Sequence, residues 1–203
     1  IISESEKKLL KKTGIKIVAQ VWGSDPEIFS KVVKEISEDG LFDGIDINMG
    51  CPDKNVVKSG ACSALIGKPD LAKEIILATK EVTDLPVSVK TRTGIRVHET
   101  ESWIGSLLET EPAAIILHGR TQKQLTDGDA DWEQIGMAVK LRDRVSKKTA
   151  ILGNGDVFSY ERGLELARQT GADGVMVGRG IFYNPWFFSS EENIKTKQER
   201  LEL

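Results

Sequence analysis

The stretch AAIILHGR, residues 113–120, is an apolar run that meets a histidine at its end, and this arrangement decides the fold class. A short apolar run of this kind predicts a strand of a parallel sheet that is covered by helices. The runs LPVSVKTR (residues 85–92) and TAILGNG (residues 149–155) have the same design, with a polar residue at or just past the end. The pattern therefore predicts parallel strands that present polar groups at their carboxyl ends.

Longer helical patterns separate these strand-like runs along the chain. PEIFSKVVKEISED (residues 26–39) has Pro26 in its first turn and Ser24 or Asp25 as a candidate cap, and SYERGLELARQTG ends at Gly171. About six strand–helix units can be counted in this way, which indicates an α/β fold with short connections.

Two α/β architectures fit this alternation, an open doubly wound sheet and a TIM (β/α)8 barrel. A doubly wound sheet concentrates its functional groups at one switch point, usually with a glycine-rich GxGxxG turn, and that turn is absent here. A barrel carries functional groups at the end of every strand, which favours the barrel. The polar residues at these strand ends are Gln20, Asn48, Lys90, His118, Asn154 and Arg179.

Six units fall two short of a complete barrel, so we expect an incomplete TIM barrel. The chain begins with SEKKLLKK, a charged helical stretch, where a barrel would already have formed strands, and it ends with the polar run EENIKTKQERLEL. We therefore expect residues 1–188 to form a partial catalytic barrel domain and residues 189–203 to begin a C-terminal helical region. The alternative is a naturally smaller α/β domain.

Composition limits the location and the partners of the protein. The 203 residues carry a formal charge of −3, which does not indicate a general nucleic-acid binder, although a local basic groove remains compatible with it. There is no apolar run of membrane-spanning length and no signal-peptide pattern at the start. With two cysteines in the chain, a cytoplasmic location without a structural disulfide is expected.

Two glycine-containing loops near the end of the chain predict a phosphate site. GNGD (residues 153–156) and GRG (residues 178–180) each follow a strand and precede a helix, where backbone N–H groups and Arg179 can bind a phosphate. Together with Gln20, Lys90 and His118 on the same barrel face, this site suits flavin mononucleotide, with Lys90 as the cation beside the reduced ring. The alternative is that both loops are only tight turns.

The two cysteines lie in DINMGCPDKNVVKSGACSALIG, residues 46–67. Two cysteines at this spacing without a nearby histidine are poor zinc ligands, and the Cys-x-x-Cys pattern of a redox pair is absent. Cys51 follows a strand on the functional face, so it is either buried filler or a thiol that donates a proton beside a hydride-delivering flavin. Cys62 is expected to be a packed structural thiol.

Several motifs, in this order, resemble the bacterial type of the tRNA-dihydrouridine synthase family. They are DINMGCP, KSGACSALIG, PVSVKTRTG, ILHGRTQKQLTDGDADW, GNGD and GADGVMVGRGIFYNPW, and they extend over residues 18–188. The resemblance implies an FMN-bearing TIM barrel that is reduced by NADPH. It also implies that the reduced flavin passes hydride to C6 of a uridine in tRNA while a cysteine protonates C5.

Site residues follow from the resemblance, position by position. The acid cysteine of the family's GCP motif is Cys51, Asn48 matches a position close to the substrate base, and Arg120 matches a motif near flavin or tRNA. The positions that match flavin contacts are Gln20, Lys90, His118, Asn154, Gly155, Asp156, Gly178 and Arg179. The family also implies a monomeric full-length protein with neither a metal ion nor a membrane as a partner.

Some features depart from the family pattern. The opening strand with its Ala-Pro-Met motif and most of the helical tRNA-binding domain are missing, and Gln122 replaces an arginine found in many members. We therefore expect weak or absent FMN binding and activity in this chain alone. Three other readings remain: a dihydroorotate dehydrogenase-like FMN barrel acting on a free pyrimidine, an RNA-binding module without enzymatic activity, and a sugar-phosphate barrel without flavin.

Overall fold

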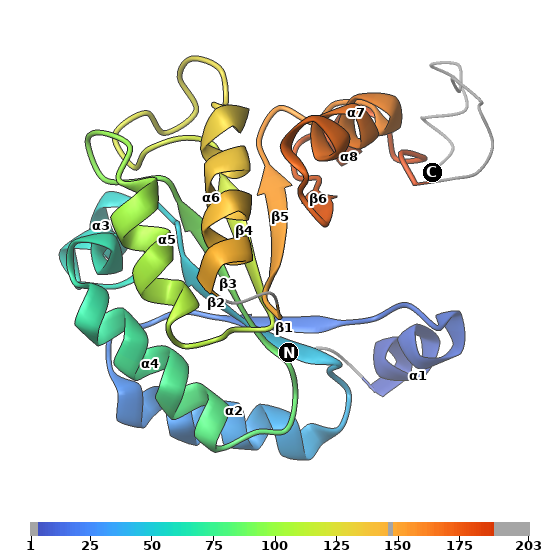
Figure 1. The fold of residues 1–203 in the computed structure, drawn as a ribbon. Helices are drawn as coiled ribbons and strands as arrows, with labels where there is room; N and C mark the ends of the chain where they lie inside the picture. The colour runs from blue at the N-terminus through green and yellow to red at the C-terminus, as the bar shows by residue number, and fades with distance from the viewer. Residues whose placement is uncertain (1–3, 146–147, 189–203) are drawn as a thin grey trace.

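The computed structural model describes residues 4–145 and 148–188, so the predicted region 189–203 lies outside the described residues (Figure 1). Its centre is one six-stranded sheet in which all neighbouring strands are parallel. The strands follow one another in the order of the sequence. They are β1 (Val18–Val21), β2 (Gly44–Met49), β3 (Val87–Arg92), β4 (Ala114–His118), β5 (Ala150–Asn154) and β6 (Gly174–Met176).

Each pair of successive strands is connected through at least one helix, whereas α1 precedes β1 and α8 follows β6. In Figure 1, α2, α4, α5 and α6 lie along one side of the sheet, and each packs against the next. A sequential strand order with one helix layer is the wall of a barrel, whereas a doubly wound sheet reverses its order. The helices are α1 (Glu4–Thr13), α2 (Pro26–Asp39), α3 (Lys54–Lys58), α4 (Pro69–Glu81), α5 (Thr100–Leu108), α6 (Trp132–Val145), α7 (Tyr160–Thr170) and α8 (Gly180–Tyr183), with a 3-10 turn η1 (Cys62–Gly67).

The two faces of the sheet differ sharply in polarity, because successive side chains of a strand point to opposite faces. The helix-covered face is the hydrophobic core, and residues such as Ile45, Ile47, Val89, Ile115, Leu117 and Ile151 are fully buried there. The opposite face carries many polar side chains from β1 to β5. These are Gln20, Asp46, Asn48, Ser88, Lys90, Arg92, His118 and Asn154. The inner face of the sheet thus carries five of the polar residues predicted at strand ends together with three that were not predicted there, Asp46, Ser88 and Arg92.

The predicted helix boundaries are confirmed where a capping residue defines them. Asp25 caps α2 by accepting hydrogen bonds from the backbone N–H groups of Glu27 and Ile28, and Pro26 occupies the first turn. Gly171 ends α7 in the left-handed conformation with φ of 74°. These local signals fix where α2 and α7 begin or end.

Two local expectations differ from the structure. The apolar run IKIVAQV, residues 15–21, predicts a buried strand, but β1 begins only at Val18, and Gln20 near the end of that run is exposed. The reason is that β1 is an edge of the sheet within the described residues, with Val18 51% exposed. The short helix α3 was not predicted, because its five residues follow a proline and show no helical repeat.

Candidate active site

The loop after β2 holds Cys51 in a tight turn that Asn48 organises. The Oδ1 atom of Asn48 accepts hydrogen bonds from the backbone N–H groups of Gly50 and Cys51, each at 3.0 Å. A Cβ atom at Gly50 would lie 3.2 Å from the Cα atom of Thr91, so the loop passes close to β3. Cys51 is half-buried, and the turn fixes its place at the carboxyl end of β2.

The second thiol, Cys62, lies below the surface beside Cys51. It is 1% exposed, and burial, followed by the neighbouring Cys51, raises its pKa to about 11. A thiol with such a pKa is a poor proton donor and a poor nucleophile. The expectation of a packed structural thiol is confirmed for Cys62, which leaves Cys51 as the accessible thiol of the pair.

A chain of amide hydrogen bonds joins β1 and β2 beneath this loop. Gln20 donates through Nε2 to Asp46 at 2.7 Å, and its Oε1 accepts from Nδ2 of Asn48 at 3.1 Å. Asp46 is 5% exposed and also accepts from the hydroxyl of Ser88 at 2.7 Å. Because a carboxylate only accepts hydrogen bonds, Asp46 holds the Nε2 end of the Gln20 amide, and the Oε1 end therefore faces Asn48. Asn48 must then donate to Gln20 through Nδ2, which leaves its Oδ1 atom to accept from the turn that holds Cys51.

Lys90 projects from β3 onto the same face and is half-buried. Its ammonium has neither an ion pair nor a hydrogen bond to any residue that the structure describes. Burial, and then the positive charge of Arg92, lower its pKa to about 8, while Asp46 acts in the opposite direction. An unpaired, partly desolvated cation of this kind is suited to bind an anionic group of a ligand.

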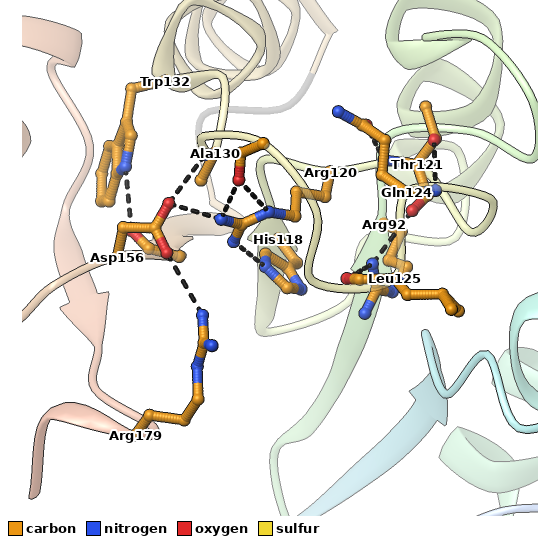
Figure 2. Close-up of polar contacts among 12 residues, drawn as sticks. Arg92, His118, Arg120, Thr121, Gln124, Leu125, Ala130, Trp132, Asp156 and Arg179 are labelled. Atoms are coloured by element: carbon orange, nitrogen blue, oxygen red, sulfur yellow. Dashed lines mark hydrogen bonds and ion pairs between the residues drawn. The ribbon is translucent and has the colours of Figure 1, made fainter.

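His118, at the end of β4, is a neutral imidazole in this setting. Burial first, then the positive charges of Lys90, Arg92 and Arg120, lower its pKa to about 3. Nε2 of His118 lies 3.2 Å from NH1 of Arg120 (Figure 2). Since a guanidinium only donates, Nε2 is the acceptor, and the proton of the neutral ring resides on Nδ1.

Arg120 is an interior anchor in this structure. It is 2% exposed, forms an ion pair with Asp156 at 2.7 Å and donates to the backbone carbonyl of Gly128 at 2.6 Å. Figure 2 shows its guanidinium between His118 and Asp156. The side chain therefore lies beside two residues that line the same pocket, His118 and Asp156.

Asp156 joins two loops by accepting from several donors. Its Oδ2 atom accepts from Arg120 and from the backbone N–H of Ala130 at 2.8 Å, and these contacts outweigh burial, so the pKa of this carboxyl is lowered. Its Oδ1 atom faces NH2 of Arg179 at 3.3 Å (Figure 2). Because Arg179 is half-exposed, its guanidinium can turn toward a ligand without unfolding its surroundings.

A pocket of about 170 Å³ opens between the loops after β5 and β6. Gly155 adopts φ of 120°, and a Cβ atom there would lie 2.5 Å from Cβ of Ala130, so only glycine fits the turn. Asn154 is a structural member of the wall, since it donates to the carbonyl of Met176 at 2.9 Å. The lining includes His118, Asn154, Gly155, Asp156, Gly178 and Arg179.

These features fit a flavin mononucleotide. The pocket offers Arg179 and two glycine loops to a phosphate, and Lys90 lacks a counterion among the described residues. The charge of Asp156 opposes a phosphate, but the buried guanidinium of Arg120 compensates it. Gln20 retains one amide hydrogen that no described group accepts, and a pyrimidine edge could accept it.

Most of the predicted site residues thus fall into two groups on the inner face of the sheet. Gln20, Asn48 and Cys51 are joined through hydrogen bonds, whereas His118, Asn154, Gly155, Asp156, Gly178 and Arg179 line one cavity. Lys90 and Arg120 belong to neither group. Sequence reasoning missed Asp46, Ser63 and Arg92. The alternation of apolar and polar residues in Ile45–Met49 would have placed Asp46 on the inner face beside Asn48.

Neither a metal centre nor a membrane span is found in the described part of the chain. Residues 4–145 and 148–188 contain no group of three or more histidine, cysteine or acidic side chains that could hold a metal ion. No helix within the same residues is long and apolar enough to cross a bilayer.

The sequential parallel sheet and its polar inner face define a protein of the α/β-barrel class, and similar solved structures support this fold class. The chain is similar to dihydroorotate dehydrogenase from Eimeria tenella, with a TM-score of 0.58 and 15% identity over 79% of this chain and 51% of that one. It is also similar to orotidine 5'-phosphate decarboxylase from Pyrococcus horikoshii, with a TM-score of 0.54 and 19% identity over 89% of this chain and 74% of that one. At these identities the likeness concerns the fold alone.

The chain belongs to the dihydrouridine synthase (Dus) family, whose model matches residues 2–202. It is 45% identical over 188 residues to a probable tRNA-dihydrouridine synthase of Staphylococcus aureus strain Mu50 and, equally, to probable tRNA-dihydrouridine synthase 2 of Bacillus subtilis strain 168. In both comparisons, 92% of this chain is covered. The chain spans 57% of the length of these relatives.

Proposed function

We propose that the protein carrying this chain is an FMN-dependent tRNA-dihydrouridine synthase that uses NADPH as its reductant. The observation that supports this most strongly is the half-buried thiol of Cys51 beside a concave face that carries an unpaired lysine. Family membership supplies tRNA as the substrate class. A cytoplasmic, monomeric enzyme is part of the same proposal.

On the cofactor side, Arg179 and the loops at Gly155 and Gly178 would hold the phosphate, while Lys90 and Gln20 would bind the ring. When bound and reduced by NADPH, FMN supplies the hydride that C6 of the uracil ring receives. Lys90 contributes the positive charge that favours an anionic ring, since its ammonium has no competing partner among the described residues. His118 offers its Nδ1–H as a neutral donor.

On the substrate side, Cys51 donates its proton to C5 of the uracil ring. General acid catalysis requires the donor to be held within hydrogen-bond reach of the atom that it protonates. The Asn48 turn provides that restraint through its contacts with two consecutive backbone N–H groups. Asn48 retains one amide hydrogen for the substrate base, and Arg120 acts from the interior by orienting His118 and Asp156 rather than by touching RNA.

The test compares oxidants of the reduced complete gene product. After anaerobic reduction with NADPH, we expect tRNA lacking dihydrouridine to reoxidise the flavin and to acquire dihydrouridine, whereas free uridine and orotate react far more slowly. Preferential reoxidation by orotate would instead support a dihydroorotate dehydrogenase-like enzyme. Absence of flavin from the purified complete protein would exclude the proposal.

A further inference from the structure

The loop that carries Cys51 is tied to a second loop, residues 119–131, which connects β4 to α6. Two separate bridges make this connection, and both end on backbone carbonyls next to the thiol. One bridge passes through Arg92, and the other passes through Ser63 and Gln122.

The first bridge is a buried guanidinium. Arg92 is 6% exposed and donates through Nε to the carbonyl of Gly50 at 2.9 Å. Its NH1 atom donates to the carbonyls of Thr121 at 2.9 Å and Leu125 at 2.8 Å, as Figure 2 shows. A single side chain therefore holds the residue before Cys51 and two residues of the 119–131 loop.

The second bridge is a hydroxyl relay. Ser63 is fully buried, and its hydroxyl donates to the carbonyl of Cys51 at 2.6 Å. Since a hydroxyl has one proton, the same oxygen can only accept from its other neighbour. That neighbour is Nε2 of Gln122, at 2.8 Å. Position 122 must therefore supply a donor if the relay is to point toward Cys51.

We propose that Gln122, acting through Ser63, is a positioning residue that holds the Cys51 loop against the 119–131 loop. This inference deepens the proposed function, and it rests on that function only where catalysis is measured. The relay fixes the carbonyl of Cys51, and the Asn48 turn fixes its N–H, so both peptide groups flanking the thiol are restrained. Small displacements of a reacting group cost large factors in rate, which makes such restraint valuable.

A donor series at position 122 in the complete gene product tests the relay. Gln122→Met removes the donor without changing charge, Gln122→Glu replaces it with an acceptor that competes for the Ser63 proton, and Gln122→Arg retains a donor. We expect Met and Glu variants to slow single-turnover reoxidation by saturating tRNA about tenfold. The arginine variant should remain near the unaltered rate. A change only in tRNA affinity in the methionine variant, with an unchanged rate at saturation, would overturn the proposal.

Two further readouts separate positioning from general stability. Ser63→Ala should reproduce the rate of Gln122→Met. The double variant should be no slower than either single variant, because each single change already breaks the whole relay. Additive losses in the cycle would overturn the relay. Iodoacetamide labelling of Cys51, followed by peptide mass spectrometry, should be faster in Gln122→Met than in the unaltered protein, with the exposed Lys123→Met as a control that does not alter labelling.

The labelling experiment does not depend on the reaction that the protein catalyses. If the unaltered protein fails to reduce tRNA but the Cys51 labelling rate follows the donor series, the proposed function fails and the relay stands. If tRNA is reduced but the labelling and turnover rates are the same in all variants at position 122, the relay fails and the proposed function stands.

Discussion

NH1 of Arg120 donates to Nε2 of His118 across 3.2 Å, and this contact assigns the ring proton of His118 to Nδ1. The same guanidinium forms an ion pair with Asp156 at 2.7 Å, so one buried cation orients both His118 and Asp156, which line the same pocket. Arg120 thereby links the end of β4 to the loop after β5.

Removing Arg120 should destabilise the fold more than removing Arg179. Arg120→Met leaves Asp156 without its closest cation at a site that is largely desolvated, and we expect a loss of about 3 kcal/mol in the free energy of unfolding. Arg179→Met should cost less than about 1 kcal/mol, because that side chain is half-exposed. Urea unfolding followed by circular dichroism measures both. Equal losses would contradict the anchor role of Arg120.

Arg179→Met should instead weaken cofactor binding. The loss of one exposed guanidinium at the phosphate pocket should raise the dissociation constant for FMN about tenfold or more, with less effect on riboflavin, which lacks the phosphate. Fluorescence titration of the complete protein, stripped of flavin, gives both constants. A parallel loss for FMN and riboflavin would place Arg179 outside the phosphate site.

FMN binding should weaken at alkaline pH through Lys90. Its pKa is lowered to about 8, so the ammonium is mostly charged at neutral pH and loses its proton as the pH rises through about 8. An anionic ligand favours the charged form, and its affinity therefore falls over the same range. Titrations from neutral pH to about pH 9.5 should show this fall, and Lys90→Met should flatten it. An unchanged slope in Lys90→Met would assign the effect to another group.

Asp46→Asn tests the amide chain beneath the site. The new amide can donate as well as accept, so Gln20 is free to reverse its ends, and FMN affinity should fall about tenfold. Ser88→Ala is the matched control, since it removes another hydrogen bond from the same carboxylate but leaves the Gln20 contact intact. An equal fall in FMN affinity in the two variants would show that the contact of Asp46 with Gln20 does not control FMN binding.

A polypeptide of these 203 residues alone should copurify with little flavin. Within the described residues β1 and β6 are both sheet edges, and the inner side of β1 at Gln20 is open to solvent. The ratio of bound flavin to protein, from absorbance after purification, measures this. Stoichiometric yellow flavin with normal turnover would contradict the expectation.

Particular residues show where sequence reasoning succeeds on this chain. The alternation of strands and helices and the positions of the two glycine loops follow from local patterns, since caps such as Asp25 and the left-handed Gly171 act within a few residues of themselves. The packed state of Cys62 also followed from its small-residue surroundings. The resemblance to the family, rather than spacing, provided the proposed role of Asn48 beside a substrate base and the proposed substrate class.

Other features depend on neighbours that are distant in sequence. The partners of Arg92 lie 29 to 42 residues away, and Gln122 meets Ser63 across 59 residues, so no local pattern encodes these bridges. The burial of Arg120 likewise depends on Asp156, which is 36 residues away. The exposure of Gln20 depends on which strands stand beside β1, and its own sequence is that of a covered strand.

The most direct test of the account compares Cys51→Ala with Cys62→Ala in the complete protein, in single-turnover reactions with tRNA. We predict that Cys51→Ala leaves flavin reduction by NADPH nearly intact but slows reoxidation by tRNA about 100-fold or more, while Cys62→Ala mainly lowers stability. Loss of reoxidation in Cys62→Ala with normal reoxidation in Cys51→Ala would contradict the account.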